Sequence, residues 1–466
     1  MKIAIIDDGV TDVNTDVSIL RKDLVVKKEG NIVTRTTEKI ISNHGSICAH
    51  IILQHIKKYL NTKKKVEFYS LCIFENKIKN SNLKQLEKAL EWCLDNQILI
   101  IHLSIGTRDY LDFCKLQMII GKMIRKGHII IAANSNYGEF TMPACMSGVF
   151  GVEADIERNF RKNEEFDYNG KLIKANSIHE LWIGKEKIKI ENYTNSFAAP
   201  VVTAKICELI LESEENLKNI AQVYSKIFKS CVWKQYRLDF IDKVCVLNLG
   251  GYSIKRRLLS FEIKEEYKSI PDFCRNYKSD FPILIIPDNK ENNNRLILNI
   301  HKLIPMHLGI IFAGKLSKEI DKIRRERFIW DETGYNNLYD TNFEKLVYRE
   351  KKNIPAIWIV GSELNLKRII KIRETLECMM YRCLCISNIK MSYLYNIEYV
   401  DEKKNIENVI EWINIYMNVD VILIYVERIE KLIKENDVIL DCNKGFTNSM
   451  IKKIIKILKG YEIGCF

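Results

Sequence analysis

Three side chains of this chain could carry out acyl-transfer chemistry if the fold brings them together. Asp7 ends a short apolar run, His44 precedes a glycine and a helical pattern, and Ser196 precedes another helical pattern. A serine hydroxyl is a weak nucleophile until a base accepts its proton. A histidine oriented by a carboxylate supplies such a base, so these residue types point to attack on a carbonyl carbon.

The stretch ENYTNSFAAP, residues 191–200, allows two interpretations of Ser196. Serine is a favoured helix N-cap, and a proline such as Pro200 is tolerated in the first turn of a helix. Taken alone, the stretch favours the capping serine. The apolar pattern that follows predicts a helix to about Leu211, and the N–H groups at its start would stabilise an oxyanion. The position therefore also suits a nucleophile.

Two further segments could serve the same reaction. The apolar run of GHIIIAANSNYG breaks into polar residues from Asn134 to Asn136, and the Asn136 amide could donate to a developing oxyanion. The run ILIIHLSIGT ends in Ser104, Ile105 and Gly106, and a glycine there would let an extended substrate approach the backbone closely. We therefore expect an oxyanion donor and a substrate-binding segment.

Buried strands must deliver these groups to one place. The runs IAIID, IIHL and HIIIAA are short and continuously apolar, which is typical of parallel strands covered on both faces. The carboxyl ends of such strands are the usual place for active sites in α/β proteins. The segments after His44 and Ser196 predict helices, so the sequence predicts an α/β fold.

The composition limits the setting. The chain has 466 residues with 47% hydrophobic content, which suits about two or three domains. Its 14 cysteines include no C-x-x-C pair, and the cluster Cys378, Cys383 and Cys385 lacks metal-site spacing, which predicts reduced thiols. Asp7 and Asp8 interrupt the first apolar run, and no apolar stretch is long enough to span a bilayer. We expect a cytoplasmic protein without an export signal or a membrane span.

Nucleic acid, metals and nucleotides are disfavoured as ligands. The net charge is +12, but the lysines are spread over helical segments without a nucleic-acid-binding motif. His44, His50 and His55 lack zincin spacing with a carboxylate, so no metal is predicted. The segment IWIVGSELNLKRIIKI has a strand, Gly361 and a helix, but it lacks a second glycine and the G-K-[ST] ending of a phosphate-binding loop. It loosely resembles a degenerate nucleotide-binding fold, and we expect no cofactor.

Four blocks resemble, in order, those of the subtilisin-like serine peptidases, the S8 family. IAIIDDGV resembles the aspartate block, NHGSICAHI the histidine block, AANSNYG the oxyanion-asparagine block and TNSFAAP the nucleophile block. LSIG lies where the family has the strand that pairs with substrate. The resemblance covers residues 1 to about 213 and implies a three-layer α/β/α fold with a parallel sheet.

The resemblance implies a role for each residue. Ser196 would attack the scissile carbonyl, and His44 would accept its proton and later protonate the leaving amine. Asp7 would orient the imidazole. Asn136 and the backbone N–H of Ser196 would bind the oxyanion, and residues 104–106 would hold the substrate as an added strand.

Four residues near this site depart from the family pattern. Thr194 and Asn195 stand where the family most often has glycine and threonine, and Ser135 replaces a glycine before the asparagine. The turn before Ser196 is then expected to be tighter or differently aimed, which would narrow substrate choice or impair catalysis. Asp8 adds a charge where a small or hydroxyl-bearing residue is usual, and the sequence suggests no role for it. The aspartate block lies so near the first residue that we expect folding without a propeptide.

The rest of the chain is expected to form a connector and a second domain. Residues 214–280 mix helical and strand-like stretches, which predicts a connector or subdomain. From 281 to 466, short apolar runs alternate with lysine-rich helical segments, which predicts a second α/β domain with a parallel sheet. Loops at its strand ends could dock a partner.

The sequence therefore predicts an intracellular serine endopeptidase of restricted specificity. Its partner would be a peptide or protein substrate. Similar intracellular enzymes with appended domains trim leader segments from ribosomally made peptides, so a precursor peptide is the substrate we favour. The alternative is a catalytically impaired peptide-binding scaffold in a peptide maturation complex.

Overall fold

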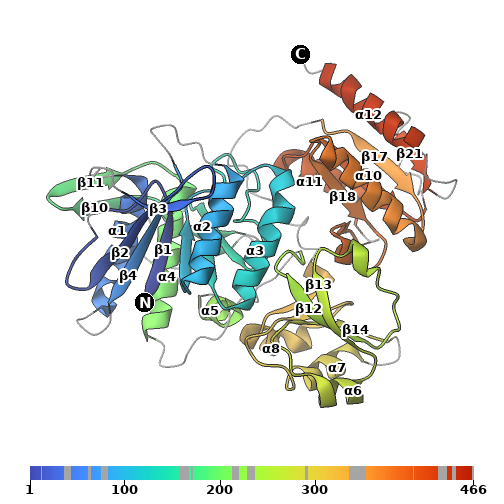
Figure 1. Ribbon diagram of the computed structural model, residues 1–466, viewed down its shortest axis with the longest axis horizontal. Helices are drawn as coiled ribbons and strands as arrows, with labels where there is room; N and C mark the ends of the chain where they lie inside the picture. Colours follow the sequence, from blue (N-terminus) through green and yellow to red (C-terminus); the bar gives the residue numbers. More distant parts are fainter. Residues whose placement is uncertain are drawn as a thin grey trace.

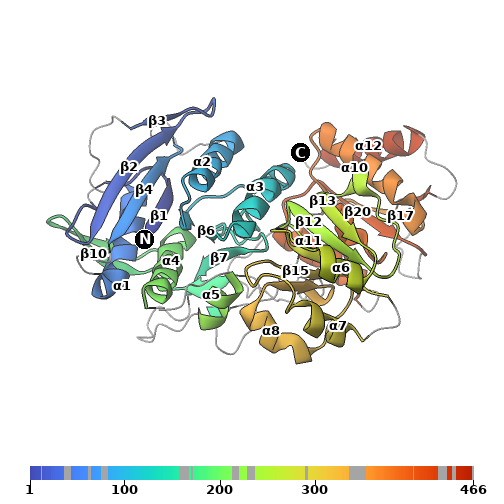
Figure 2. The ribbon, with the colours of Figure 1, turned by 60° about the horizontal axis from the view of Figure 1, so that its bottom comes forward.

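The chain folds into three α/β units. The computed structural model describes residues 1–11, 13–35, 43–60, 65–74, 82–156, 167–168, 172–212, 220–227, 237–288, 292–334, 353–401, 404–428, 438–442 and 448–463. We call the three parts the N-terminal unit (1–227), the middle unit (237–334) and the C-terminal unit (353–463). Figure 1 shows the N-terminal unit, blue to green, on one side and the other two together on the opposite side. Figure 2 shows the same grouping from a second direction.

The N-terminal unit is built on a nine-stranded sheet in the order β3-β2-β4-β1-β5-β6-β7-β9-β8. Its strands are β1 (Lys2–Asp7), β2 (Ser18–Val26), β3 (Ile32–Thr34), β4 (Val66–Cys72), β5 (Ile100–Leu103), β6 (Ile129–Ala133), β7 (Val149–Ala154), β8 (Asp167–Tyr168) and β9 (Ile173–Ala175). All neighbours from β2 to β9 are parallel, and the edge strands β3 and β8 are antiparallel to theirs. The predicted parallel sheet is confirmed.

Helices cover both faces of this sheet because its central strands are apolar on both sides. Successive residues of a strand point to opposite faces. Ile3 and Ile5 join one core cluster, whereas Ala4 and Ile6 join another. The first cluster packs under α1 (His44–Ile56) and α4 (Asn195–Glu212), and the second under α2 (Leu83–Asp95) and α3 (Phe113–Arg125). The predicted α/β/α layers are confirmed.

Smaller elements complete the N-terminal unit. They are the 3-10 turns η1 (Lys57–Tyr59) and η2 (Tyr110–Asp112), the hairpin of β10 (His179–Ile183) and β11 (Glu186–Ile190), and α5 (Ile220–Ile227). None of the helices that the structure describes combines the length and the apolar composition needed to cross a membrane.

The middle unit holds a five-stranded parallel sheet in the order β13-β12-β14-β15-β16. Its elements are β12 (Lys243–Asn248), η3 (Arg256–Leu258), β13 (Glu262–Tyr267), α6 (Ile270–Asn276), β14 (Ile283–Ile286), α7 (Asn293–Ile300), β15 (Ile310–Phe312), η4 (Lys318–Ile320), α8 (Asp321–Glu326) and β16 (Ile329–Asp331). The predicted connector, 214–280, contains β12 and β13, so the predicted boundary at 280 divides this sheet. Parallel strands pair across a long crossover, and β12 finds its partner β14 beyond that boundary.

The C-terminal unit holds a second five-stranded parallel sheet, in the order β19-β18-β20-β17-β21. Its elements are β17 (Ala356–Val360), η5 (Glu363–Asn365), α10 (Leu366–Cys378), β18 (Cys383–Ser387), η6 (Ser392–Tyr395), β19 (Glu398–Tyr399), α11 (Ile406–Tyr416), β20 (Val421–Val426), β21 (Val438–Asp441) and α12 (Asn448–Ile463). Residues 281–466 were expected to form one α/β domain. Their strands are instead distributed over two sheets.

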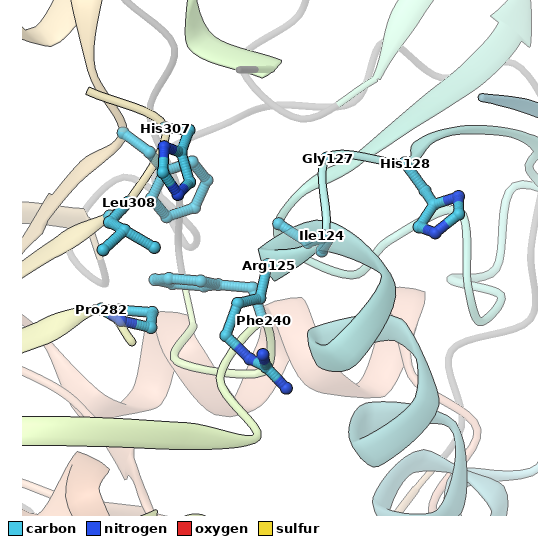
Figure 3. Close-up of a pocket in the computed structure, with 10 residues that line it drawn as sticks. Ile124, Arg125, Gly127, His128, Phe240, Pro282, His307 and Leu308 are labelled. Atoms are coloured by element: carbon cyan, nitrogen blue, oxygen red, sulfur yellow. The ribbon is translucent and has the colours of Figure 1, made fainter. Parts of the chain in front are cut away.

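The N-terminal and middle units meet along α3. Arg125, the last residue of that helix, pairs with Asp242 through two bonds of 2.9 and 2.7 Å. Beside this pair, the ring of Phe240 is buried and lies edge-on to Phe328, with centroids 4.2 Å apart. Figure 3 shows Phe240 and Arg125 beside Ile124, around a cavity of about 30 Å³. This contact is therefore close-packed.

Candidate active site

Asp7, His44 and Ser196 lie in one line of hydrogen-bonding distances. His44 Nδ1 is 2.7 Å from Asp7 Oδ2, and His44 Nε2 is 3.0 Å from Ser196 Oγ. Asp7 ends β1, His44 begins α1 and Ser196 lies in the first turn of α4. The structure thus brings together the three residues that were singled out in the sequence, from elements far apart along the chain.

Asp8 holds the start of α1 in place. Its carboxylate accepts hydrogen bonds from the backbone N–H groups of His44 at 3.1 Å and Gly45 at 2.8 Å. Asn43, the N-cap, accepts from Ser46 N at 3.2 Å. A negative charge at a helix N-terminus is stabilising, because the N–H groups there lack intrahelical partners. The sequence suggested no role for Asp8, because its partners lie 36 and 37 residues away and meet it only in the folded chain.

The start of α4 differs from the expectation for a capping serine. Pro200 lies inside the helix, beyond its first turn. Because proline has no N–H, the Ser196 carbonyl four residues earlier loses its helical partner. That carbonyl oxygen instead lies 3.4 Å from Ser104 Oγ and 3.7 Å from Cys48 Sγ. The Ser196 hydroxyl faces His44 rather than closing the helix end.

Asn195 ties the serine turn to two neighbouring segments. Its Nδ2 donates to the carbonyls of Asn134 at 3.2 Å and Ser135 at 2.9 Å, and its Oδ1 accepts from Ala154 N at 2.8 Å. A threonine at this position, as the family most often has, could not span all three groups, because its side chain has one hydroxyl. The departure at Asn195 therefore has a structural function that spacing alone did not reveal.

Asn136 is held next to the serine turn by its own side chain. Its Oδ1 accepts a hydrogen bond from the backbone N–H of Asn195 at 2.8 Å. This contact leaves the Nδ2 group, which has no hydrogen-bond partner among the described residues, as a donor on an exposed residue. The Ser196 N–H likewise has no acceptor within the described ranges. Two N–H donors therefore lie on adjoining segments, the loop of Asn136 and the serine turn, and their role as an oxyanion hole stays a prediction.

The predicted substrate-binding segment 104–106 has partners within the protein. Ser104 Oγ is 2.9 Å from His102 Nε2, so it points toward the interior. Ile105 is half-buried and packs against the core under α2 and α3. A Cβ at Gly106 would lie 2.8 Å from the Met142 carbonyl oxygen, so the glycine is already required by the protein's own packing. That the backbone of this segment pairs with the substrate as an added strand stays a prediction.

His102 is a buried polar residue that the sequence did not single out. It is fully buried, and its Nδ1 lies 2.9 Å from Thr203 Oγ1 of α4. Burial lowers the pKa of His102 to about 4, so the ring is neutral at ordinary pH. Through Ser104, this ring connects two positions of α4, the Thr203 hydroxyl and the Ser196 carbonyl. A histidine within an apolar strand was the signal that could have found it.

The charge on His44 depends on its neighbours. Burial acts to lower the pKa of His44, but the charges and hydrogen bonds of Cys48 and Asp7 outweigh it and raise this pKa. Cys48 Sγ lies 3.8 Å from His44 Nδ1. Burial raises the pKa of Asp7, but His44 outweighs it, so this carboxylate stays ionised. The Phe197 ring packs on the imidazole, with centroids 4.7 Å apart.

Asp7, His44 and Cys48 also offer three ligand atoms within 4.8 Å of one another. Over the described part of the chain, this is the group of His, Cys, Asp and Glu residues whose spacing could hold a metal ion. A metal on His44 Nδ1 would replace its hydrogen bond to Asp7. The absence of a metal from the resting site stays a prediction.

Side chains from other segments fill the space beside the loop at Gly361. A Cβ at Gly361 would lie 2.7 Å from the Tyr425 hydroxyl, and that hydroxyl donates to the Ser362 carbonyl at 2.6 Å. The Arg368 guanidinium donates to the carbonyl of Cys442. These contacts take up the space and the charge that a phosphate-binding loop would offer to a nucleotide.

Comparison with known proteins gives one family match. The model of the subtilase family, Peptidase_S8, matches residues 1–221. No curated protein matches the chain. The prenylagaramide maturation protease PagA is 19% identical, with a TM-score of 0.33 over 45% of this chain and 74% of that one.

Two other solved structures show similar values. The epidermin leader peptide processing serine protease EpiP from Staphylococcus aureus is 17% identical, with a TM-score of 0.35 over 45% of this chain and 65% of that one. The self-cleaved protease domain of PatA is 19% identical, with a TM-score of 0.33 over 46% of this chain and 80% of that one. The assignment rests on the family match and the ordered blocks: residues 1–221 of this chain belong to the subtilases, the subtilisin-like S8 peptidases.

Proposed function

We propose that the chain is a serine endopeptidase that cleaves peptide bonds with Ser196, His44 and Asp7. The observation that carries this proposal is the pair of distances, 2.7 Å from Asp7 to His44 and 3.0 Å from His44 to Ser196. Both distances lie within the hydrogen-bond range expected between a nucleophile, its base and the group that orients the base. The arrangement suits attack by an activated hydroxyl.

In the first half of the proposed reaction, His44 Nε2 accepts the Ser196 proton while Ser196 Oγ bonds to the scissile carbonyl carbon. Asp7 keeps the Nδ1 proton oriented and stabilises the imidazolium that forms. The carbonyl oxygen gains negative charge, which the Ser196 N–H and the Asn136 Nδ2 would stabilise. When the carbon–nitrogen bond breaks, His44 returns the proton to the leaving amine.

Water completes the reaction by the same route. His44 accepts a proton from a water molecule, whose oxygen bonds to the ester carbon of the acyl-enzyme. When the carbon–oxygen bond to Ser196 breaks, His44 protonates the serine. A carboxylic acid product leaves, and the free enzyme is restored.

We further propose that the substrate is a precursor peptide that the middle and C-terminal units help to recruit. A cavity of about 1020 Å³ lies at the carboxyl ends of the middle sheet, and Lys390, Met391 and Tyr399 of the C-terminal unit close its other side. Its lining includes both acidic and basic side chains, such as Asp288 and Lys315. A polar peptide segment suits such a surface, and ligands of open α/β sheets bind at this edge. An intracellular setting fits the free thiols of the described cysteines.

A fluorophosphonate probe tests the catalytic proposal. Wild-type protein should be labelled at Ser196, Ser196→Ala should not be labelled, and His44→Ala should lose most of the labelling while keeping its fold. Asn136→Ala should bind substrate normally but slow turnover by about 10²–10³-fold. If native wild-type protein resists the probe yet binds peptide, the impaired scaffold becomes the better assignment, and the unusual Thr194 and Asn195 would be its cause.

A pair of substrates tests recruitment. Lys390→Ala should raise the KM for a full-length precursor and leave the KM for a short peptide around the cleavage site unchanged. Met379→Ala is a matched control, because Met379 is an exposed residue of the same unit that does not line the cavity. Equal effects of the two substitutions on the precursor would remove the cavity from the proposal.

A further inference from the structure

We propose that the C-terminal unit positions Asn136 for catalysis, and that Phe140 is the residue through which it acts. This inference rests on the proposed function, because it assigns a means of regulation to the same site. Phe140 touches neither the triad nor a substrate in this proposal. It is a positioning residue that acts through Asn136, four residues earlier in the same loop.

The side chain of Phe140 is buried in a different unit from its backbone. Phe140 belongs to the loop after β6, in the N-terminal unit, and is 5% exposed. The core cluster that contains it is otherwise made largely of C-terminal residues. Its ring centroid lies 5.1 Å from that of Trp412 and 6.4 Å from that of Tyr416, both on α11. Aromatic pairs at such separations add to the stabilisation from burial alone.

The backbone of the loop is bound to the same helix end. The Phe140 N–H donates to the Tyr416 carbonyl at 3.1 Å. Glu139 pairs with Arg108 at 3.1 Å, and the Arg108 carbonyl accepts from Asn418 Nδ2 at 3.4 Å. The C-terminal unit therefore contacts both the loop of Asn136 and the segment after Gly106.

The loop is fixed at three places. At its base, Asn134 Oδ1 accepts from Thr141 N at 3.2 Å and from Thr141 Oγ1 at 3.0 Å. On its inner side, Asn136 Oδ1 accepts from the N–H of Asn195. On its outer side, Phe140 is held by the C-terminal unit. Asn136 is exposed and makes the inner attachment itself, next to the bonds from the Asn195 amide to the Asn134 and Ser135 carbonyls. Loss of the outer attachment therefore removes a support on the other side of its amide.

Catalysis depends on such anchoring more strongly than binding does. An oxyanion donor must sit within hydrogen-bond distance of the charged oxygen, and a misplacement of about 1 Å can cost about 10²-fold in rate. A substrate held by other contacts would still bind. A displaced Asn136 therefore lowers kcat with little change in KM. Any event that shifts α11 relative to the N-terminal unit would have the same effect.

The test compares two buried aromatic residues at two unit interfaces. Phe140→Ala should lower kcat by about 10–100-fold with KM within about twofold, since Asn136 itself accounts for about 10²–10³-fold. Phe140→Leu, which keeps apolar volume, should recover part of the loss. Phe240→Ala is the matched control, because Phe240 is 4% exposed and packs at the other interface, beside Ile124 and Arg125 of α3 (Figure 3). It should lower the melting temperature and leave kcat unchanged.

A double-mutant cycle separates positioning from general loosening. In an Asn136→Ala background, Phe140→Ala should lower kcat by less than about threefold, because two substitutions that act through one group are not additive. Full additivity, or an equal loss of kcat in Phe240→Ala, would overturn the inference.

Hydrogen exchange separates this inference from the proposed function. Phe140→Ala should speed amide exchange in residues 135–140 and Phe240→Ala should not, whether or not the protein cleaves peptides. If the fluorophosphonate probe does not label wild-type protein but Phe140→Ala speeds exchange, the proposed enzyme is rejected and the coupling is kept. Active wild-type protein with unchanged exchange and unchanged kcat in Phe140→Ala would reject the coupling and keep the enzyme.

Discussion

Replacing Asn195 tests whether this departure from the family pattern stabilises the site or is merely accommodated by it. Asn195→Ala removes three side-chain hydrogen bonds, to Asn134 and Ser135 and from Ala154. The Ala154 N–H, on a residue that is 5% exposed, would be left without its acceptor. With a net contribution of about 0.5–1.5 kcal/mol for each bond, the free energy of unfolding should fall by about 2–4 kcal/mol.

Two further substitutions at the same position show which bonds matter. Asn195→Asp keeps the acceptor for Ala154 but places a carboxylate oxygen against two carbonyl oxygens, so it should be more destabilising than alanine at neutral pH. Asn195→Thr should recover less than half of the alanine loss. Urea denaturation followed by circular dichroism gives all three values. A loss below about 0.5 kcal/mol for alanine, or an aspartate variant as stable as wild type, would refute the reasoning.

Three other predictions concern charge and ligand binding. His44 serves as a base only when neutral, and Cys48 and Asp7 raise its pKa, so kcat/KM should rise with pH, and Cys48→Val should move this acid limb to lower pH; an unmoved limb would remove Cys48 from the account. Asp8→Ala leaves two N–H groups of α1 without acceptors and should lower the free energy of unfolding by about 1–2 kcal/mol, as thermal or urea denaturation would show. Calorimetry with ATP and GTP should show no binding, because Tyr425 fills the space at Gly361, and micromolar affinity would contradict this.

The parts that could be predicted from the sequence are those with local signals. Continuous apolar runs ending in polar residues identified β1, β5 and β6 and placed Asp7 and Asn136 at strand ends. The helices after His44 and Ser196 followed from apolar periodicity. Because parallel strands bring such ends to one edge of a sheet, spacing and residue type were enough for an α/β fold with a parallel sheet. The three layers and their extent, to about residue 213, followed from the resemblance to the subtilisin-like peptidases.

Long-range pairing is what the sequence did not reveal. The strands β12 and β13 looked like parts of a connector, because nothing local shows that their partner lies beyond residue 280. Deletion of 281–466 would therefore cut the middle sheet and remove the contacts of Phe140 at once. The bonds of Asn195 and Asp8 depend on segments that meet only in the folded chain. Their residue types suggested polar contacts, but their spacing did not show where the partners are.

The buried pairing of Arg237 with Glu398 makes the three units mutually dependent. Arg237 begins the middle unit, its backbone N–H donates to Ser147 Oγ of the N-terminal unit at 3.1 Å, and its guanidinium pairs with Glu398 of the C-terminal unit. Neither side chain is more than 7% exposed, so a unit that lacked one partner would leave the other charge buried and unpaired, which costs several kcal/mol. Because Arg237 joins all three units, we expect the chain to melt in one cooperative transition on heating. Evolution could then add or exchange such units only where the new unit restores a counter-charge for Arg237.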